Sequence, residues 1–162
     1  MESENKTTGF AKPTNASELR LSRDLAAVPE LLPGIELTFP DPTKIRSFKV
    51  SFSPAQGLWH RGKFEFSFNI TREWPYQPPK VLLLTKVWHP NISEDGHVCL
   101  NILKRNYNPT LTIVQIIVGL QFLFNEPNPN DPLNHAAAEQ YNKAFDLFKN
   151  KAEEYIDLYC PK

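Results

Sequence analysis

The sequence predicts one α+β domain, in which an N-terminal helix precedes a four-stranded antiparallel meander and C-terminal helices follow it. The length of 162 residues and the hydrophobic fraction of 41% suit a single domain with a sizeable core. Apolar residues recur with helical spacing toward both ends of the chain and alternate with a period of two between residues 35 and 70. The 15 prolines lie mainly between these segments, where they indicate rigid connections.

The N-terminal part of the chain divides into an arm and a helix. Residues 1–16 are polar apart from Phe10 and predict a flexible arm, which leaves residues 17–162 as the folded domain. Ser17 is a good N-cap, so we expect the helix to begin there and to end at the prolines that start with Pro29. The apolar face of this helix is expected to carry Leu21, Leu25 and Val28.

The central part of the chain predicts four strands. Three segments alternate between apolar and polar residues, which is typical of strands with one buried face, and they centre on residues 35–39, 48–52 and 64–70. The links between them are rich in turn residues and short enough for antiparallel neighbours. The fourth segment, residues 81–84, is continuously apolar, so we expect a strand that is covered on both faces.

The C-terminal part predicts three helices. Thr112, with Gln115 three residues later, forms a capping-box pattern at the start of the run IVQIIVGLQFLF. Because this run is apolar on nearly every side, we expect it to be the buried helix. Asn134 and Asn150 are the predicted N-caps of the other two helices. Their apolar residues are Ala137, Tyr141, Phe145 and Phe148 in the first, and Ala152, Tyr155, Ile156 and Tyr159 in the second.

The composition argues against several classes of protein. The 18 basic residues balance 18 acidic ones, whereas a non-specific nucleic-acid binder needs a clearly basic surface, so we expect no nucleic-acid partner. No apolar stretch approaches the roughly 20 residues that span a membrane, and the polar start of the chain lacks the apolar centre of a secretory signal. The sequence therefore predicts an intracellular protein without a membrane partner. Its two cysteines, Cys99 and Cys160, form neither a disulfide framework nor a Cys-x-x-Cys zinc pair.

The segment HPNISEDGHVCLNILKRNYNP has turn residues at both ends and no sustained helical or strand period. Long ordered connections of this kind are usually functional. Cys99 lies within the segment, whereas Cys160 lies near the end of the chain. A thiolate is a strong nucleophile and its sulfur is a good leaving group, so Cys99 could accept an acyl group and pass it on. The alternative is that Cys99 is a small buried apolar residue between Val98 and Leu100.

Other side chains in and after this segment also have two interpretations. His89 and His97 are candidate bases for a cysteine hydrolase and, together with Cys99, candidate zinc ligands, although no fourth Cys or His has a usual spacing. Asn91 could donate an N–H to a developing oxyanion or close its own loop. Asp131, between prolines in NPNDPLN, could form a turn or direct its carboxylate at a site.

Four motifs occur in a specific order and spacing: WPYQPPKV, HPNISEDGHVCLNIL, PTLTI and EPNPNDPLN. They closely resemble the catalytic domain of ubiquitin-conjugating enzymes over about residues 17–159, and His-Pro-Asn followed at eight residues by Cys-Leu is the most specific part. Within that family the chain is most similar to the neddylation enzyme, which conjugates the ubiquitin-like modifier of cullins. The similarity rests on Asn101, where most ubiquitin carriers have Asp, and on the runs LFNEPNPNDPLNHAAAE and GLWHRGKFEFSF.

The resemblance implies a role for each candidate residue. Cys99 would accept the C-terminal glycine of a ubiquitin-like protein as a thioester from an activating enzyme and yield it to a substrate lysine. Asn91 would steady the oxyanion or the loop that presents it, and Asp131 would orient the incoming lysine and favour its neutral form. No catalytic histidine is expected, so His89 returns to a structural role. Neither a metal nor a cofactor is implied, since ATP is used by the activating enzyme.

The resemblance also implies protein partners in the cytoplasm and nucleus: the modifier, a heterodimeric activating enzyme, a RING-type ligase and a cullin substrate. Arg20 and Arg23 match basic positions that meet the activating enzyme, although a solvated helix face explains the same charges. Tyr76 and the run Asn108, Pro109 and Thr110 match the two loops that meet RING-type ligases. Tyr107 stands where a tryptophan is common in the family, an exchange that could alter ligase choice. The alternatives are a ubiquitin carrier, a catalytically silent binding module and a cysteine hydrolase.

Overall fold

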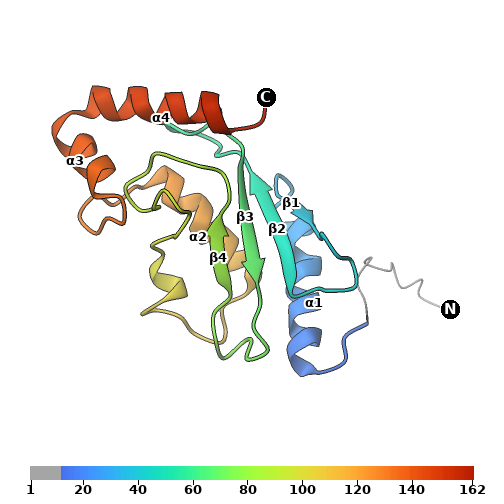
Figure 1. The fold of residues 1–162 in the computed structure, drawn as a ribbon. Coiled ribbons are helices and arrows are strands. Elements are labelled where there is room, and N and C mark those ends of the chain that lie inside the picture. The colour runs from blue at the N-terminus through green and yellow to red at the C-terminus, as the bar shows by residue number, and fades with distance from the viewer. Residues whose placement is uncertain (1–11) are drawn as a thin grey trace.

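The computed structural model describes residues 12–162, which form four α-helices, one short 3-10 helix and a four-stranded sheet (Figure 1). In chain order the elements are α1 (Ala16–Leu31), β1 (Glu36–Thr38), β2 (Ser47–Phe52), β3 (Phe64–Asn69), β4 (Lys80–Leu83), η1 (Asn101–Leu103), α2 (Ile113–Asn125), α3 (His135–Lys143) and α4 (Phe145–Tyr159). The predicted order of a helix, four strands, an irregular segment and C-terminal helices is confirmed.

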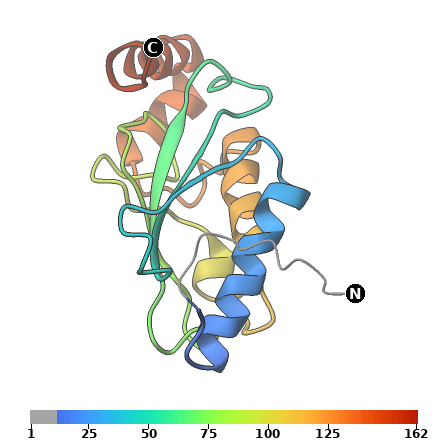
Figure 2. The same ribbon diagram turned by 90° about the vertical axis from the view of Figure 1, so that its right-hand side faces the viewer.

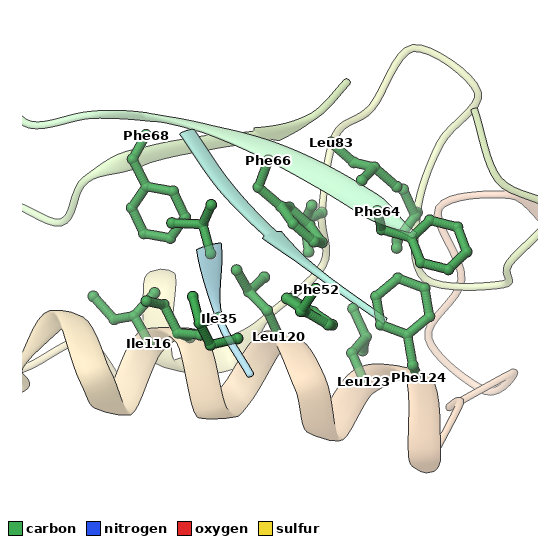
Figure 3. Packing of buried hydrophobic residues seen from close by; sticks show 14 of the residues in the cluster. Ile35, Phe52, Phe64, Phe66, Phe68, Leu83, Ile116, Leu120, Leu123 and Phe124 are labelled. Atoms are coloured by element: carbon green, nitrogen blue, oxygen red, sulfur yellow. The ribbon is translucent and has the colours of Figure 1, made fainter. Parts of the chain in front are cut away.

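The strands form an antiparallel meander in the order β1-β2-β3-β4, as predicted. The alternating phenylalanines of β3 are fully buried, and Figure 3 shows Phe66 and Phe68 facing Ile116 and Leu120 of α2. Figure 2 shows α1 and α2 side by side on this face of the sheet. The core therefore lies between one face of the sheet and these two helices, and α3 and α4 lie beyond one end of the sheet.

The prediction that residues 81–84 form a strand covered on both faces is wrong. Strand β4 lies at the edge of the sheet, and only Leu83 is buried against the core, whereas Leu82 and Leu84 are exposed. A run of apolar residues does not reveal whether helices cover one face of a sheet or both. Here α1 and α2 cover one face, so alternate side chains of the run point away from them.

The N-cap of helix α1 lies two residues before the predicted Ser17. Asn15 is its N-cap and accepts a hydrogen bond from the Glu18 N–H, while the Ser17 hydroxyl donates to the Trp74 carbonyl. Pro29 does not end the helix, which continues for two residues because the next N–H groups still find carbonyl partners. Most of the predicted flexible arm, including Phe10, lies outside the described residues.

Helix α2 has the predicted capping box, in which Thr112 and Gln115 each bind the other's backbone N–H. The expectation that it is buried on nearly every side holds only in part. Most of its apolar residues lie in the core, but Val118 is exposed and Phe122 is 59% exposed, because one side of the helix contacts neither the sheet nor α1. Among residues 12–162, no helix is both long and apolar enough to span a membrane.

The C-terminal helices divide at a different residue from the one predicted. Asn134 caps α3 as expected, with its side chain accepting from the Ala137 N–H at 3.0 Å. Asn150 is not a cap, because α4 already begins at Phe145 and runs through it. The break lies at Ala144, whose φ of −146° and ψ of 62° are not helical. Phe145 and Phe148 therefore belong to α4 instead of α3.

Candidate active site

The irregular segment before α2 is an ordered part of the fold. Isolated bridges pair Ile92 with both His89 and Val98, and His97 pairs with Leu82 of β4. Gly96 adopts a φ of 92°, and a Cβ at this position would lie 2.2 Å from the Leu83 carbonyl oxygen. The segment is thus fixed against the edge of the sheet by close backbone contacts that only glycine permits at this point.

His89 is completely buried and holds backbone groups. Its Nδ1 accepts the Asn91 N–H at 2.9 Å, so its Nε2 carries the proton and donates to the Leu123 carbonyl at 2.9 Å. Burial lowers the pKa of His89 to about 4, and the hydrogen bond to Leu123 opposes this shift only in part. Both ring nitrogens are engaged in this neutral form, so His89 is not arranged as a general base for Cys99.

Asn91 is 2% exposed and binds the loop that carries Asp131. Its Oδ1 accepts the Asn128 N–H at 2.7 Å, and its Nδ2 donates to the carbonyls of Asn128 at 2.7 Å and Asp131 at 3.2 Å. The Asn91 carbonyl also accepts the Cys99 N–H at 2.9 Å. Asn91 therefore connects the backbone of Cys99 to the 128–131 loop, and its amide is engaged in binding that loop.

Cys99 and Asp131 meet at the surface. The Sγ of Cys99 lies 3.8 Å from Oδ2 of Asp131, a distance at which the thiol donates a weak hydrogen bond. Burial, followed by the Asp131 carboxylate, raises the pKa of the Cys99 thiol, while Lys104 opposes this rise. Cys99 is half-buried, so the residue is partly exposed at the surface. The structure thus brings together the two residues that the sequence places 32 positions apart.

A pocket of about 250 Å³ surrounds this pair. Its walls are formed by Asn91, Cys99, Leu100, Asn101, Ile102, Phe122, Leu123, Glu126, Asn128 and Asp131. Phe122, Glu126 and Asn128 were not among the candidates from the sequence. Phe122 was missed because the sequence predicted that α2 is buried on nearly every side. Asn128 could have been found, because it lies in the proline-rich run EPNPNDPLN that holds Asp131.

The zinc alternative has no support in the described part of the chain, where no three His, Cys, Asp or Glu side chains form a group suited to a metal. His97 is exposed, and its Nε2 lies 3.5 Å from Asp95 instead of contacting Cys99. Because His89 and His97 are both directed elsewhere, the hydrolase dyad also lacks its base.

The predicted partner-binding residues differ in their accessibility. Tyr76 is 77% exposed, and the run Asn108, Pro109 and Thr110 is exposed beside it in a turn that the Asn108 side chain stabilises. Arg23 is exposed and makes no hydrogen bond or ion pair with any residue in 12–162. Arg20 instead points inward, where it donates to the Leu111 carbonyl at 3.1 Å and lies 3.7 Å from Asp24. The two arginines thus have different roles within the fold.

Comparison with known proteins assigns the class that the fold and site define. A profile of the family described as "Ubiquitin-conjugating enzyme" matches residues 20–156, which is most of the chain. The chain belongs to this family and is a conjugating enzyme for ubiquitin or a ubiquitin-like protein, as the sequence motifs predicted.

Relatives within the family carry a more particular name. The "Nedd8-conjugating enzyme UbcE2M" of Drosophila melanogaster is 44% identical over 150 residues, a match covering 92% of this chain and 82% of the relative. The "NEDD8-conjugating enzyme Ubc12" of Arabidopsis thaliana is 43% identical over 140 residues, covering 85% of this chain and 76% of the relative. The solved structure named "S. cerevisiae Ubc12" superposes with a TM-score of 0.78 at 38% identity, covering 88% of this chain and 80% of that one. These relatives confirm the predicted resemblance to neddylation enzymes.

Proposed function

We propose that this chain carries a NEDD8-like modifier as a thioester on Cys99 and transfers it to lysines of cullins. The observation that carries the proposal is the pairing of the accessible Cys99 thiol with the Asp131 carboxylate at 3.8 Å. The choice of modifier is supported by the names of the relatives, which match most of this chain and most of their own length. Asn101, beside Cys99 in the pocket, is the residue of this site that first pointed to that modifier.

Two acyl transfers make up the proposed reaction. In the first, the Cys99 thiol loses its proton, its sulfur attacks the thioester carbonyl on the activating enzyme, and the sulfur of that enzyme leaves. In the second, the amine of a substrate lysine attacks the new thioester, a C–N bond forms, and the Cys99 sulfur leaves and regains a proton. A free lysine has a pKa of about 10.4, so the second transfer needs a group that accepts the proton of the amine. We assign this task to the Asp131 carboxylate, because its Oδ2 lies 3.8 Å from the sulfur.

Asn91 acts in this proposal through the loop that it binds. Its three hydrogen bonds to Asn128 and Asp131 hold the carboxylate beside the sulfur. It is therefore a positioning residue, and the alternative of a direct bond to the oxyanion would require the amide to leave these partners.

The proposed partners follow from the exposed residues. Arg23 is available to the heterodimeric activating enzyme, and Tyr76 with residues 108–110 forms the surface for a RING-type ligase. An exposed aromatic residue beside prolines suits an interface anchor. The activating enzyme uses the ATP, so the proposal gives this chain no cofactor of its own. The proposed location is the cytoplasm and nucleus, as expected for an enzyme that modifies cullins.

The test is to incubate the protein with ATP and with either NEDD8 or ubiquitin, each with its own activating enzyme. Reducing and non-reducing gels then identify a thioester as a band that a thiol removes. We expect such a band with NEDD8 and little with ubiquitin. The Cys99→Ser variant should give a band that resists thiols, because an oxyester replaces the thioester, and Cys160→Ser should behave like the wild type.

Each other result points to a different function. A preference for ubiquitin would identify a ubiquitin carrier and would remove the argument from Asn101. No band with either modifier would favour a silent binding module, and a band that persists as thiol-sensitive in Cys99→Ser would show that another residue is the acceptor.

A further inference from the structure

Tyr107 connects the two turns that carry the exposed ligase-type residues. Its ring packs against the hydrophobic core, and its hydroxyl reaches the backbone of residues 74–77, where it donates to the Pro75 carbonyl. The Gln77 carbonyl lies 3.3 Å from the same hydroxyl. The two carbonyls flank Tyr76, so one hydroxyl holds the backbone on both sides of the most exposed aromatic residue of this surface.

The second turn, residues 108–111, begins directly after Tyr107. The Asn108 side chain accepts from the Thr110 N–H at 2.8 Å and from the Thr110 hydroxyl at 2.7 Å, and the Leu111 N–H donates to the Asn108 carbonyl at 3.0 Å. This turn is therefore rigid within itself. Its distance from the 74–77 turn depends on side chains that cross between the two.

A second side chain crosses between the same turns. Arg20 of α1 donates to the Leu111 carbonyl at 3.1 Å, and its guanidinium lies 5.7 Å from the centre of the Trp74 ring. Arg20 and Tyr107 thus each connect the two turns. Burial raises the pKa of the Tyr107 hydroxyl, so it stays protonated and continues to donate at neutral pH.

We infer that the Tyr107 hydroxyl is a positioning group that fixes Tyr76 and residues 108–110 as one preformed surface for a RING-type ligase. The inference rests on the proposed function, which assigns this surface to the ligase, and it adds the residue that orders it. A partner that binds two turns at once loses affinity when they move independently, because binding must then order them. Phenylalanine would keep the ring in the core but lose the hydrogen bond to the 74–77 turn.

The test compares Tyr107→Phe with Tyr155→Phe. The control loses a hydroxyl of the same kind, which donates to Glu94 at 2.6 Å in another part of the surface. For each loaded protein, release of the modifier is measured with free lysine alone and then with increasing amounts of a purified RING-domain ligase that accelerates release from the wild type. Hydrogen exchange of the Tyr76 and Gln77 amides is measured in parallel.

We expect Tyr107→Phe to load normally and to release the modifier to free lysine at the wild-type rate. The ligase concentration for half-maximal acceleration should rise about fivefold, the change that corresponds to one hydrogen bond of about 1 kcal/mol. The Tyr76 and Gln77 amides should exchange faster in this variant, while Tyr155→Phe leaves both measurements unchanged.

An unchanged ligase concentration in Tyr107→Phe, with the wild type loaded and accelerated, would overturn the inference and leave the proposed function intact. Equal losses in loading, unassisted release and ligase response would indicate a general structural defect and would also overturn it. A wild type that cannot be loaded at all would refute the proposed function, and the inference would fall with it.

Discussion

Replacing Asn91 with alanine tests whether this residue positions Asp131 or acts on the oxyanion. The substitution removes three hydrogen bonds, two to the backbone of Asn128 and one to the backbone of Asp131. The hydrogen bond from the Cys99 N–H to the carbonyl of residue 91 should remain, because it involves backbone alone. The loop with Asp131 should therefore loosen, while Cys99 keeps its place.

The expected loss of stability follows from the number of hydrogen bonds that Asn91→Ala removes. Each contributes about 1 kcal/mol net, so the free energy of unfolding should fall by about 3 kcal/mol. For a chain of this size, about 1 kcal/mol corresponds to roughly 2–4 °C, and the melting temperature should fall by about 6–12 °C. Asn128→Ala is the matched control. Within the described residues 12–162, the Asn128 side chain makes a single hydrogen bond, which it accepts from the Asn130 N–H, and the backbone bonds to Asn91 survive its removal. Asn128→Ala should lower the free energy of unfolding by about a third as much as Asn91→Ala does.

The assay combines urea unfolding with separate rates of loading and of release to lysine. We expect Asn91→Ala to slow release more than loading, because in the proposed reaction the Asp131 carboxylate accepts the proton of the attacking amine. If Asn91 acts through Asp131, its loss should have little further effect on release in an Asp131→Ala background. Independent, multiplicative effects of the two substitutions, together with unchanged stability of Asn91→Ala, would refute the positioning argument and favour direct contact with the oxyanion.

Three further predictions concern single side chains. Asp131→Asn should lower the pKa of Cys99 by removing a neighbouring negative charge, so that alkylation of the thiol reaches half its maximal rate at a lower pH; an unchanged or higher midpoint would contradict this. His89 protonates near 6.5 when unfolded but only near 4 when folded, so unfolding takes up a proton between these values. The free energy of unfolding should thus fall by about 3 kcal/mol as the pH drops through this range, and His89→Gln should lack this part of the slope in urea titrations. Arg23→Ala should weaken loading by the activating enzyme without changing the melting temperature, whereas Arg20→Ala should lower the melting temperature. Calorimetry and loading rates test this, and a lower melting temperature in Arg23→Ala with none in Arg20→Ala would contradict it.

Local patterns in the sequence predicted most of the fold. The alternation of Phe64, Phe66 and Phe68 and the capping box at Thr112 each involve neighbouring residues, so periodicity and spacing revealed them. The errors arose where contacts between distant parts of the chain determine the structure. The apolar run at residues 81–84 does not indicate that helices cover only one face of the sheet. Asn150 has the residue type of an N-cap, but it lies inside a helix that begins at Phe145.

For the candidate site, too, local motifs revealed the residues but not the contacts between distant parts of the chain. The motif around Cys99 pointed to the thiol and Asn91, and the run EPNPNDPLN pointed to Asp131, but neither showed whether Asn91 faces an oxyanion or a loop. Three hydrogen bonds across 37 to 40 positions of sequence favour the loop, and no local pattern contains them. Arg20 and Arg23 were equivalent as charges on a helix, and the contacts of Arg20 with Asp24, Trp74 and Leu111 separate them.

The arrangement around Cys99 also bears on why a thioester would persist there long enough to be transferred. Water becomes a competitor for a thioester when a base activates it, and a histidine is the usual base in cysteine hydrolases. His89 is neutral with both nitrogens bound to backbone, and His97 pairs with Asp95, so within residues 12–162 neither bonds to the sulfur. Asp131 is the proton acceptor in the proposed reaction, and a carboxylate is too weak a base to activate water well at neutral pH. An amine needs less help, because it attacks as a strong nucleophile once it has lost one proton. In the proposed reaction, the pairing of Cys99 with Asp131 therefore keeps hydrolysis slow and favours transfer to a lysine that a partner brings to Asp131.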